Sequence, residues 1–150
     1  MSSIIFTDHK DFNPDYTPKQ IFELGSFGGT YWRPIYSNVV GKEFKDVYKK
    51  YKCLKGIDKK LMTKKWDDYD TNINRYKVKV GMTLEFWESM GWVHAQDPYG
   101  WIQWYCEFYE GRRTPDDIRQ IKRWRGVKNR FNLSNKTPAM KQTLQHWAIA

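Results

Sequence analysis

Hydrophobic residues recur at helical spacing in the last third of the chain. Between residues 98 and 110, Trp101, Trp104, Tyr105 and Phe108 lie at positions i, i+3, i+4 and i+7, and a second apolar row runs beside them. Only a narrow strip of this segment is polar. We therefore expect a helix over 98–110 that is almost surrounded by protein.

A second periodic segment follows after a short glycine-containing turn. Its apolar stripe is narrower and consists of Ile118, Ile121 and Trp124, with basic residues between them. This spacing predicts a helix over 115–125 that buries one side only. The two helices, at about 98–125, have the outline of a helix-turn-helix pair. Together they supply the expected core: Trp101, Trp104, Tyr105, Phe108, Ile118, Ile121 and Trp124.

Helix starts are marked by a repeated device, a threonine followed by proline. The hydroxyl of an N-cap threonine accepts a hydrogen bond from a free amide of the first turn, and proline at the first helical position loses no bond. Thr17, Thr114 and Thr137 precede prolines in this way, and Asp97-Pro98 is the carboxylate version. The predicted helices are 18–24, 98–110, 115–125 and 138–148, with Gly25, Gly111 and Gly126 at helix ends.

Four further segments have weaker patterns. Residues 83–91 predict a short helix, and 42–54 places aromatic residues at helical spacing between lysines. Residues 30–36 are aromatic-rich but contain Pro34, which favours an edge strand or irregular chain. Residues 76–80 alternate like a half-exposed strand. We predict a mainly α fold with a minor β element, in a single globular domain spanning 1–150.

Composition adds aromatic content and limits the classes of protein. Phe, Tyr and Trp number 26 of the 150 residues, which is the composition of a packed core rather than of a disordered chain. The two cysteines, Cys53 and Cys106, have no CxxC partner, so we expect buried free thiols rather than a disulfide framework or a zinc site. No apolar run reaches the length of a membrane span or a signal peptide. We therefore expect an intracellular protein that does not associate with a membrane.

The net charge is +9, and much of it lies in residues 111–130, where eight basic residues face two aspartates. Because Asp116 and Asp117 stand at the start of the second helix and the basic residues later, the pattern favours contact with phosphates over base recognition. Arg33, flanked by aromatic residues, is a further candidate. The predicted nucleic-acid contacts are Arg33, Arg112, Arg113, Arg119, Lys122, Arg123, Arg125, Lys128 and Arg130. The alternative is surface charge matched to the helix dipole.

The segment 42–65 is a second basic stretch, with ten lysines against three acidic residues. Lysine is a point charge without the bidentate fork of arginine. A contact made here would ignore sequence and weaken steeply with salt, so we regard these lysines as an accessory surface. Lysines that are only solvated remain the other interpretation.

No catalytic motif stands out. His9, His94 and His146 lack metal-ligand spacing, and no phosphate loop or nucleophile elbow is present. Asp67, Asp68 and Asp70 are compatible with a cation site but lack the glycine-centred calcium pattern, and a solvated acidic turn has the same composition. We therefore expect no catalytic residues, no cofactor and no assigned metal site.

Several blocks resemble an uncharacterised family that we associate with giant DNA viruses of the marseillevirus kind and with scattered algal, plant and fungal proteins. The first is the run from Asp97 to Cys106, and it continues through Gly111-Arg112-Arg113 to Arg123-Trp124. Residues 27–35 and 91–93 are further blocks. The resemblance covers roughly residues 20–125. It carries no activity over, but it implies work near a viral genome, in the host cytoplasm or nucleus, at a replication site or in the virion.

The sequence thus favours a non-catalytic, weakly sequence-selective protein that binds DNA, with RNA as the alternative polymer. Two rival hypotheses belong to other classes. One is a virion or assembly protein, a homo-oligomer whose subunit contacts involve the helix 138–148, with Met140, Leu144 and Trp147. The other is an enzyme or small-ligand binder with an aromatic pocket near Trp32, Trp92 and Trp101.

Overall fold

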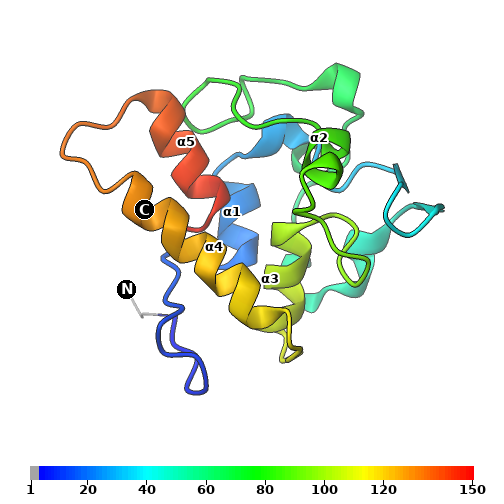
Figure 1. Ribbon diagram of the computed structural model, residues 1–150. Helices are drawn as coiled ribbons and strands as arrows, with labels where there is room; N and C mark the ends of the chain where they lie inside the picture. Colours follow the sequence, from blue (N-terminus) through cyan, green and yellow to red (C-terminus); the bar gives the residue numbers. More distant parts are fainter. Residues whose placement is uncertain (1–3) are drawn as a thin grey trace.

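The structure is a computed structural model that describes residues 4–150, and it is mainly helical, as predicted (Figure 1). Its α-helices are α1 (Pro18–Glu23), α2 (Leu84–Ser89), α3 (Trp101–Tyr109), α4 (Asp117–Arg130) and α5 (Pro138–His146). Two short strands, β1 (Ile35–Ser37) and β2 (Lys42–Phe44), pair antiparallel with Ile35 opposite Phe44. The 3-10 turns are η1 (Phe27–Gly29), η2 (Val47–Lys50), η3 (Lys52–Leu54), η4 (Lys59–Leu61) and η5 (Trp66–Asp68).

The core is centred on α3, which packs against both α1 and α4 (Figure 1). Trp104 and Phe12 are fully buried, and their rings lie 5.4 Å apart, centroid to centroid. Phe12 also meets Trp124 of α4 edge-on at 5.1 Å. Six of the seven predicted core residues are buried, and the seventh, Ile118, is 65% exposed. That prediction was wrong because Ile118 points away from the side of α4 that covers α3.

Two predicted helix caps, Thr17 and Thr137, are confirmed, and Thr83 caps α2 in the same way. The side chains of Thr17, Thr83 and Thr137 each accept a hydrogen bond from the backbone N–H three residues on. Thr114 instead begins a turn, and α4 starts two residues later than predicted, at Asp117. Asp97 caps no helix: α3 begins only at Trp101, after Gly100 turns the chain with a φ of 94°.

The helix predicted for 42–54 is wrong. Asp46 has a left-handed φ of 58°, and on either side of it lie β2 and the turns η2 and η3. The apolar pattern resembled that of an α-helix because Tyr48, Tyr51 and Leu54 recur every three residues. That spacing suits the three residues per turn of a 3-10 helix, and all three side chains are buried.

The strand predicted for 76–80 is also wrong, since this segment pairs with no strand among residues 4–150. Side chains hold it instead. The backbone N–H of Tyr76 donates to Gln142 Oε1 at 3.0 Å, and Asn74 Nδ2 donates to the Val78 carbonyl at 2.7 Å. Lys77 has a φ of 58°, which breaks the extended conformation.

Gly126 does not end the helix that contains it, contrary to the prediction, because α4 continues to Arg130. Gly25 and Gly111, by contrast, follow α1 and α3 with φ of 99° and 108°, as glycines do at helix ends. The thiols are free as expected; Cys106 is buried, whereas Cys53 is partly exposed.

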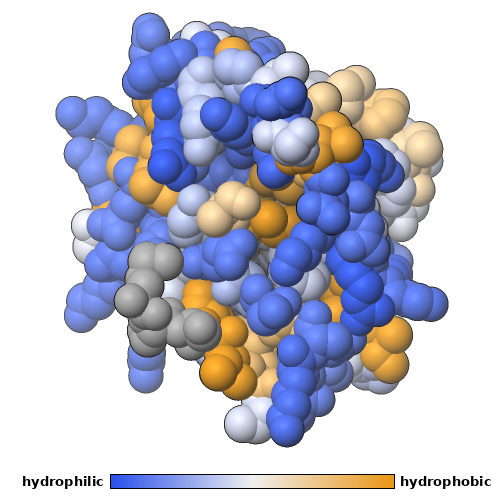
Figure 2. Space-filling view, turned by 90° about the vertical axis from the view of Figure 1, so that its left-hand side faces the viewer, coloured by the Kyte–Doolittle hydropathy of each residue, from blue (hydrophilic) through white to orange (hydrophobic). Residues whose placement is uncertain are grey.

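The surface formed by α5, the α4–α5 connection and the N-terminal segment is mostly hydrophilic, with small separate hydrophobic areas (Figure 2). Within residues 4–150, no helix has the length and apolar content that a bilayer crossing requires.

Candidate functional site

Four of the nine predicted nucleic-acid contacts are engaged in ion pairs within the chain. Arg112 forms a two-point pair with Asp97, with Nη1–Oδ1 and Nη2–Oδ2 distances of 2.8 and 2.6 Å. Asp97 is only 1% exposed, so this pair is part of the fold. Because the guanidinium fork is already filled by a carboxylate, Arg112 is poorly placed to bind phosphate.

Arg113, Arg119 and Arg125 are paired nearer the surface. Arg113 Nε donates to Asp8 Oδ2 at 2.6 Å, and its guanidinium lies 3.6 Å from the centroid of the Phe108 ring. Arg119 donates to both carboxylate oxygens of Asp116, at 2.6 and 3.0 Å. Arg125 pairs with Asp11. These aspartates neutralise much of the charge that the sequence places after α3.

The other five predicted contacts form no ion pair among residues 4–150: Arg33, Lys122, Arg123, Lys128 and Arg130. They do not form one surface. Lys122 is exposed, and Lys128 lies over the ring of Trp124 at 5.1 Å. Arg123 and Arg130 line a pocket, and Arg33 lines a smaller hollow beside it. Three of the five therefore lie at two neighbouring cavities, and the larger of these is the candidate site described next.

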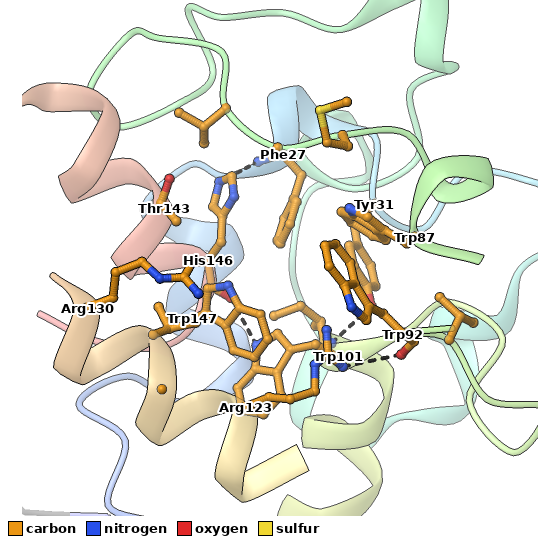
Figure 3. Close-up of a pocket in the computed structure, with 18 of the residues that line it drawn as sticks. Phe27, Tyr31, Trp87, Trp92, Trp101, Arg123, Arg130, Thr143, His146 and Trp147 are labelled. Carbon is orange, nitrogen blue, oxygen red and sulfur yellow. Dashed lines mark hydrogen bonds between the residues drawn. The ribbon is translucent and has the colours of Figure 1, made fainter. Parts of the chain in front are cut away.

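The pocket has a volume of about 510 Å³ and lies between α3, α4, α5, η1 and the segment 80–93 (Figure 3). We call it the tryptophan pocket, because Trp87, Trp92, Trp101 and Trp147 line it, together with Phe27 and Tyr31. Figure 3 shows Trp87 and Trp92 on one side and Trp147 on the other. Its size is within the range of pockets for small molecules.

The walls are fixed by aromatic stacking from the core outward. Trp147, just after α5, stacks on Trp101 of α3 with ring centroids 4.6 Å apart. The indole N–H of Trp101 donates to the carbonyl of His146 at 3.1 Å, which ties α3 to α5. Trp92 is 38% exposed at the mouth of the pocket. The aromatic surface is therefore held rigidly on one side and is open to solvent at the other.

His146 is the titratable group at the inner end of the pocket. Its Nε2 accepts a hydrogen bond from the backbone N–H of Phe27 at 3.1 Å, and its ring stacks on Phe27 at 3.9 Å. Burial lowers the pKa of His146 to about 3. The imidazole is neutral at physiological pH, so this residue contributes a flat ring and no charge.

Arg123 supplies charge to the wall of the pocket. Its Nη1 donates to Gln120 Oε1 at 2.8 Å and to the Trp92 carbonyl at 3.3 Å, and its guanidinium lies 5.2 Å from the centroid of Trp147. Burial, together with the charge of nearby Arg119, lowers the pKa of Arg123 to about 10. The side chain stays cationic at neutral pH, but its charge is poorly solvated and lacks a carboxylate partner among the described residues.

Arg123 and Arg130 are the only charged side chains among the described residues that line the pocket, given that His146 is neutral. No carboxylate lines it in the part of the chain from 4 to 150. An aromatic surface with cationic groups and no anionic group favours a planar ligand that carries negative charge.

Comparison of this chain with models of protein families, with curated proteins and with solved structures finds no match. The resemblance to a giant-virus family therefore stays a prediction.

The lysines of 42–65 are mostly exposed, and they lie within and around the turns η2, η3 and η4. Lys50 pairs with Glu107 at 3.1 Å and Lys49 with Asp46 at 3.8 Å, while the other eight form no ion pair among the described residues. They remain candidates for an accessory contact with phosphates.

Sequence reasoning found part of the pocket. Of the aromatic residues proposed for it, Trp92 and Trp101 line it, whereas Trp32 is fully buried in the core. Phe27, Trp87 and Trp147 were missed, because nothing in their local sequence shows that they meet.

Asp67, Asp68 and Asp70 form a turn in which Asp70 accepts from the Asn72 N–H at 2.9 Å. Nowhere in residues 4–150 do three His, Cys, Asp or Glu side chains gather as a metal site requires.

Proposed function

We propose that the protein is a non-catalytic nucleic-acid-binding protein that holds one unpaired base in the tryptophan pocket. The observation that carries this proposal is the lining of the pocket: four tryptophans, two arginines and no carboxylate among the described residues. Nucleobases are planar, and the strand that bears them is anionic. The pocket matches both properties.

Stacking of a base on an aromatic side chain contributes about 1–3 kcal/mol and tolerates any base. A pocket of about 510 Å³ has room for a base and its sugar. Recognition of this kind is weakly sequence-selective, which agrees with the expectation from the sequence. It requires a base outside a duplex, so single-stranded or locally opened nucleic acid is the preferred partner.

The charges of the site argue against a cationic ligand. Aromatic residues also form cages for quaternary ammonium groups, but there the attraction is between a cation and the ring faces. Here Arg123 and Arg130 would repel such a ligand. The exposed lysines of 42–65 add a surface along which the rest of a strand can lie, held by non-specific phosphate contacts.

The test is fluorescence anisotropy of a labelled single strand and of its duplex, measured from about 50 to 200 mM salt, where phosphate contacts weaken steeply. DNA is the polymer that the viral resemblance favours, and RNA of the same sequence is the comparison. We expect the single strand to bind more tightly than the duplex. Absence of binding at 50 mM salt would contradict the proposal.

Trp92→Ala is the decisive variant, because Trp92 lies at the mouth of the pocket and is partly exposed. Loss of one stacking contact should weaken single-strand binding by about 5- to 100-fold. Tyr36→Ala is the matched control, since Tyr36 is an exposed aromatic residue that does not line the pocket. Equal affinities of Trp92→Ala and wild type would place the contact elsewhere.

A second candidate function is the binding of a free anionic aromatic metabolite, which the aromatic and cationic lining of the same pocket also favours. A thermal-shift screen with nucleotides and aromatic acids tests it, because a ligand that binds only the folded state raises the melting temperature. Of the residues named for the assembly hypothesis, Leu144 is 3% exposed and Trp147 stacks on Trp101 within the chain, whereas Met140 is partly exposed, and the hypothesis stays a prediction.

A further inference from the structure

A smaller hollow adjoins the tryptophan pocket and is lined by a cationic residue of its own, Arg33. Its volume is about 40 Å³, and it shares Phe27, Tyr31, Trp87 and His146 with the larger pocket. Arg33 and Trp66 line only the smaller hollow. This space is too small for a base, but it suits one compact group such as a phosphate.

Arg33 is held as an anion-binding residue would be. Its Nη1 donates to the Thr30 carbonyl at 3.0 Å, and its guanidinium lies over Trp66 at 5.2 Å. Burial lowers the pKa of Arg33, and the charge of nearby Glu85 offsets part of this effect. Glu85 forms no direct ion pair with Arg33, and neither does any other carboxylate among residues 4–150. A partly desolvated guanidinium that forms no direct ion pair gains from contact with an anionic ligand.

Lys79 is a second cationic residue close to Trp66, and it also lies over the neighbouring ring of Tyr69. Its Nζ lies 4.9 Å from the centroid of Trp66 and 4.8 Å from that of Tyr69, and both rings line the hollow. The two cavities together have an aromatic middle, with Arg123 and Arg130 on the side of α4 and Arg33 in the lining of the smaller hollow, while Lys79 lies over the rings of Trp66 and Tyr69.

We propose that the site takes a nucleotide unit with a phosphate on each side of its sugar: the base lies in the tryptophan pocket, one phosphate meets Arg123 and Arg130, and the other meets Arg33 and Lys79. This inference rests on the proposed function. Every internal nucleotide of a single strand carries two such phosphates, whereas a strand end or a free monophosphate carries one. The site therefore selects the interior of a single strand.

Isothermal titration calorimetry at about 50 mM salt tests the proposal, with a nucleoside 5′-monophosphate, a nucleoside 3′,5′-bisphosphate and a short single-stranded oligonucleotide as probes. The bisphosphate should bind at least about tenfold more tightly than the monophosphate, because one added charge-assisted contact is worth that factor. Equal affinities of the two nucleotides would overturn the two-phosphate site.

Arg33→Gln should remove the advantage of the bisphosphate and leave monophosphate affinity within about twofold of wild type. Lys79→Ala should reduce the same advantage, and it is informative even if Arg33→Gln fails to fold, since Lys79 is exposed. Lys10→Ala, another exposed lysine, is the matched control. An advantage that survives both substitutions would overturn the proposal.

The proposed function, binding of a single strand, would be contradicted by a different result from the one that would contradict the two-phosphate site. If nucleotides bind with the expected advantage but the oligonucleotide does not bind, the two-phosphate site stands and strand binding is refuted. If none of the three probes binds, the pocket does not recognise nucleotides, and both proposals are refuted.

Discussion

Asp97 and Arg112 form a two-point ion pair that joins the segment before α3 to the segment after it, with N–O distances of 2.8 and 2.6 Å. The Asp97 side chain also accepts a hydrogen bond from Gln96 at 3.0 Å. Arg112 thus stabilises the fold around α3, although the sequence had suggested a phosphate contact. Its role shows why a count of basic residues overstated the charge that the segment after α3 presents to a ligand.

Removing one partner of a buried pair leaves the other charge without compensation, which costs about 3–5 kcal/mol. Because the Arg112 side chain is 25% exposed, we expect Asp97→Asn to lower the free energy of unfolding by about 3 kcal/mol. Urea unfolding followed by tryptophan fluorescence measures the change. Asp67→Asn, at an exposed aspartate, is the control and should change stability by less than about 0.5 kcal/mol. A cost below about 1 kcal/mol for Asp97→Asn would contradict the assigned role.

His146 should make the protein sensitive to mild acid. Its pKa is about 3 in the fold and 6.5 in the unfolded chain, so between these values the unfolded state binds the proton and the native state does not. The stabilising contribution is complete above pH 6.5 and is lost as the pH falls toward 3. Between pH 7 and pH 5 the loss should be about 2 kcal/mol.

Denaturant unfolding at several pH values checks this prediction. His146→Gln cannot titrate, so its stability curve should be flatter than that of wild type between pH 7 and pH 5, whatever the absolute stability of the variant. Parallel curves for the two proteins would show that His146 is protonated alike in both states.

Two glycine substitutions should act in opposite directions. A Cβ on Gly25 would lie 1.9 Å from the Ile73 carbonyl oxygen, and the φ of 99° is unfavourable for alanine, so Gly25→Ala should cost on the order of 3 kcal/mol or more. Gly126 lies inside α4 with no atom within 4 Å of a Cβ. Gly126→Ala should therefore raise stability by about 0.5–1 kcal/mol. Thermal unfolding of both variants provides the measurement, and a destabilised Gly126→Ala would refute the second expectation.

The lysine surface should contribute affinity that disappears with salt. Replacing Lys52, Lys55 and Lys59 by alanine should weaken all single strands alike and reduce the slope of log K against log salt by about 0.7 per lost contact. Anisotropy titrations at several salt concentrations give the slope. An unchanged slope would identify these lysines as merely solvated, which was the alternative from the sequence.

The sequence predicted the helices well where local chemistry decides. Thr17 and Thr137 cap helices because an adjacent proline and a free hydroxyl act within one turn. It failed for 42–54, since a three-residue repeat fits an α-helix and successive 3-10 turns almost equally, and the choice between them depends on tertiary packing. Ile118 was misplaced for a similar reason, because the buried side of α4 is set by contact with α3 rather than by its own stripe.

The site was harder to predict, because its parts come from distant segments. Phe27 and His146 are 119 residues apart in the chain, yet their rings stack at 3.9 Å. Spacing along the chain reveals periodicity, whereas a pocket arises from the packing of elements against one another. Arg33 was singled out from its aromatic neighbours in sequence, but its principal aromatic contact is Trp66, more than thirty residues away.

The origin of the pocket walls in η1, the 80–93 segment, α3, α4 and α5 has a consequence for dynamics. The cavity needs all of these elements, because each contributes residues to its wall. A bound ligand therefore cannot remain in place when any one of them unfolds. Occupancy should therefore slow amide hydrogen exchange in α3, α4 and α5 together, although only a few of their residues touch the ligand. Binding would couple the cooperative unfolding units of the domain into one.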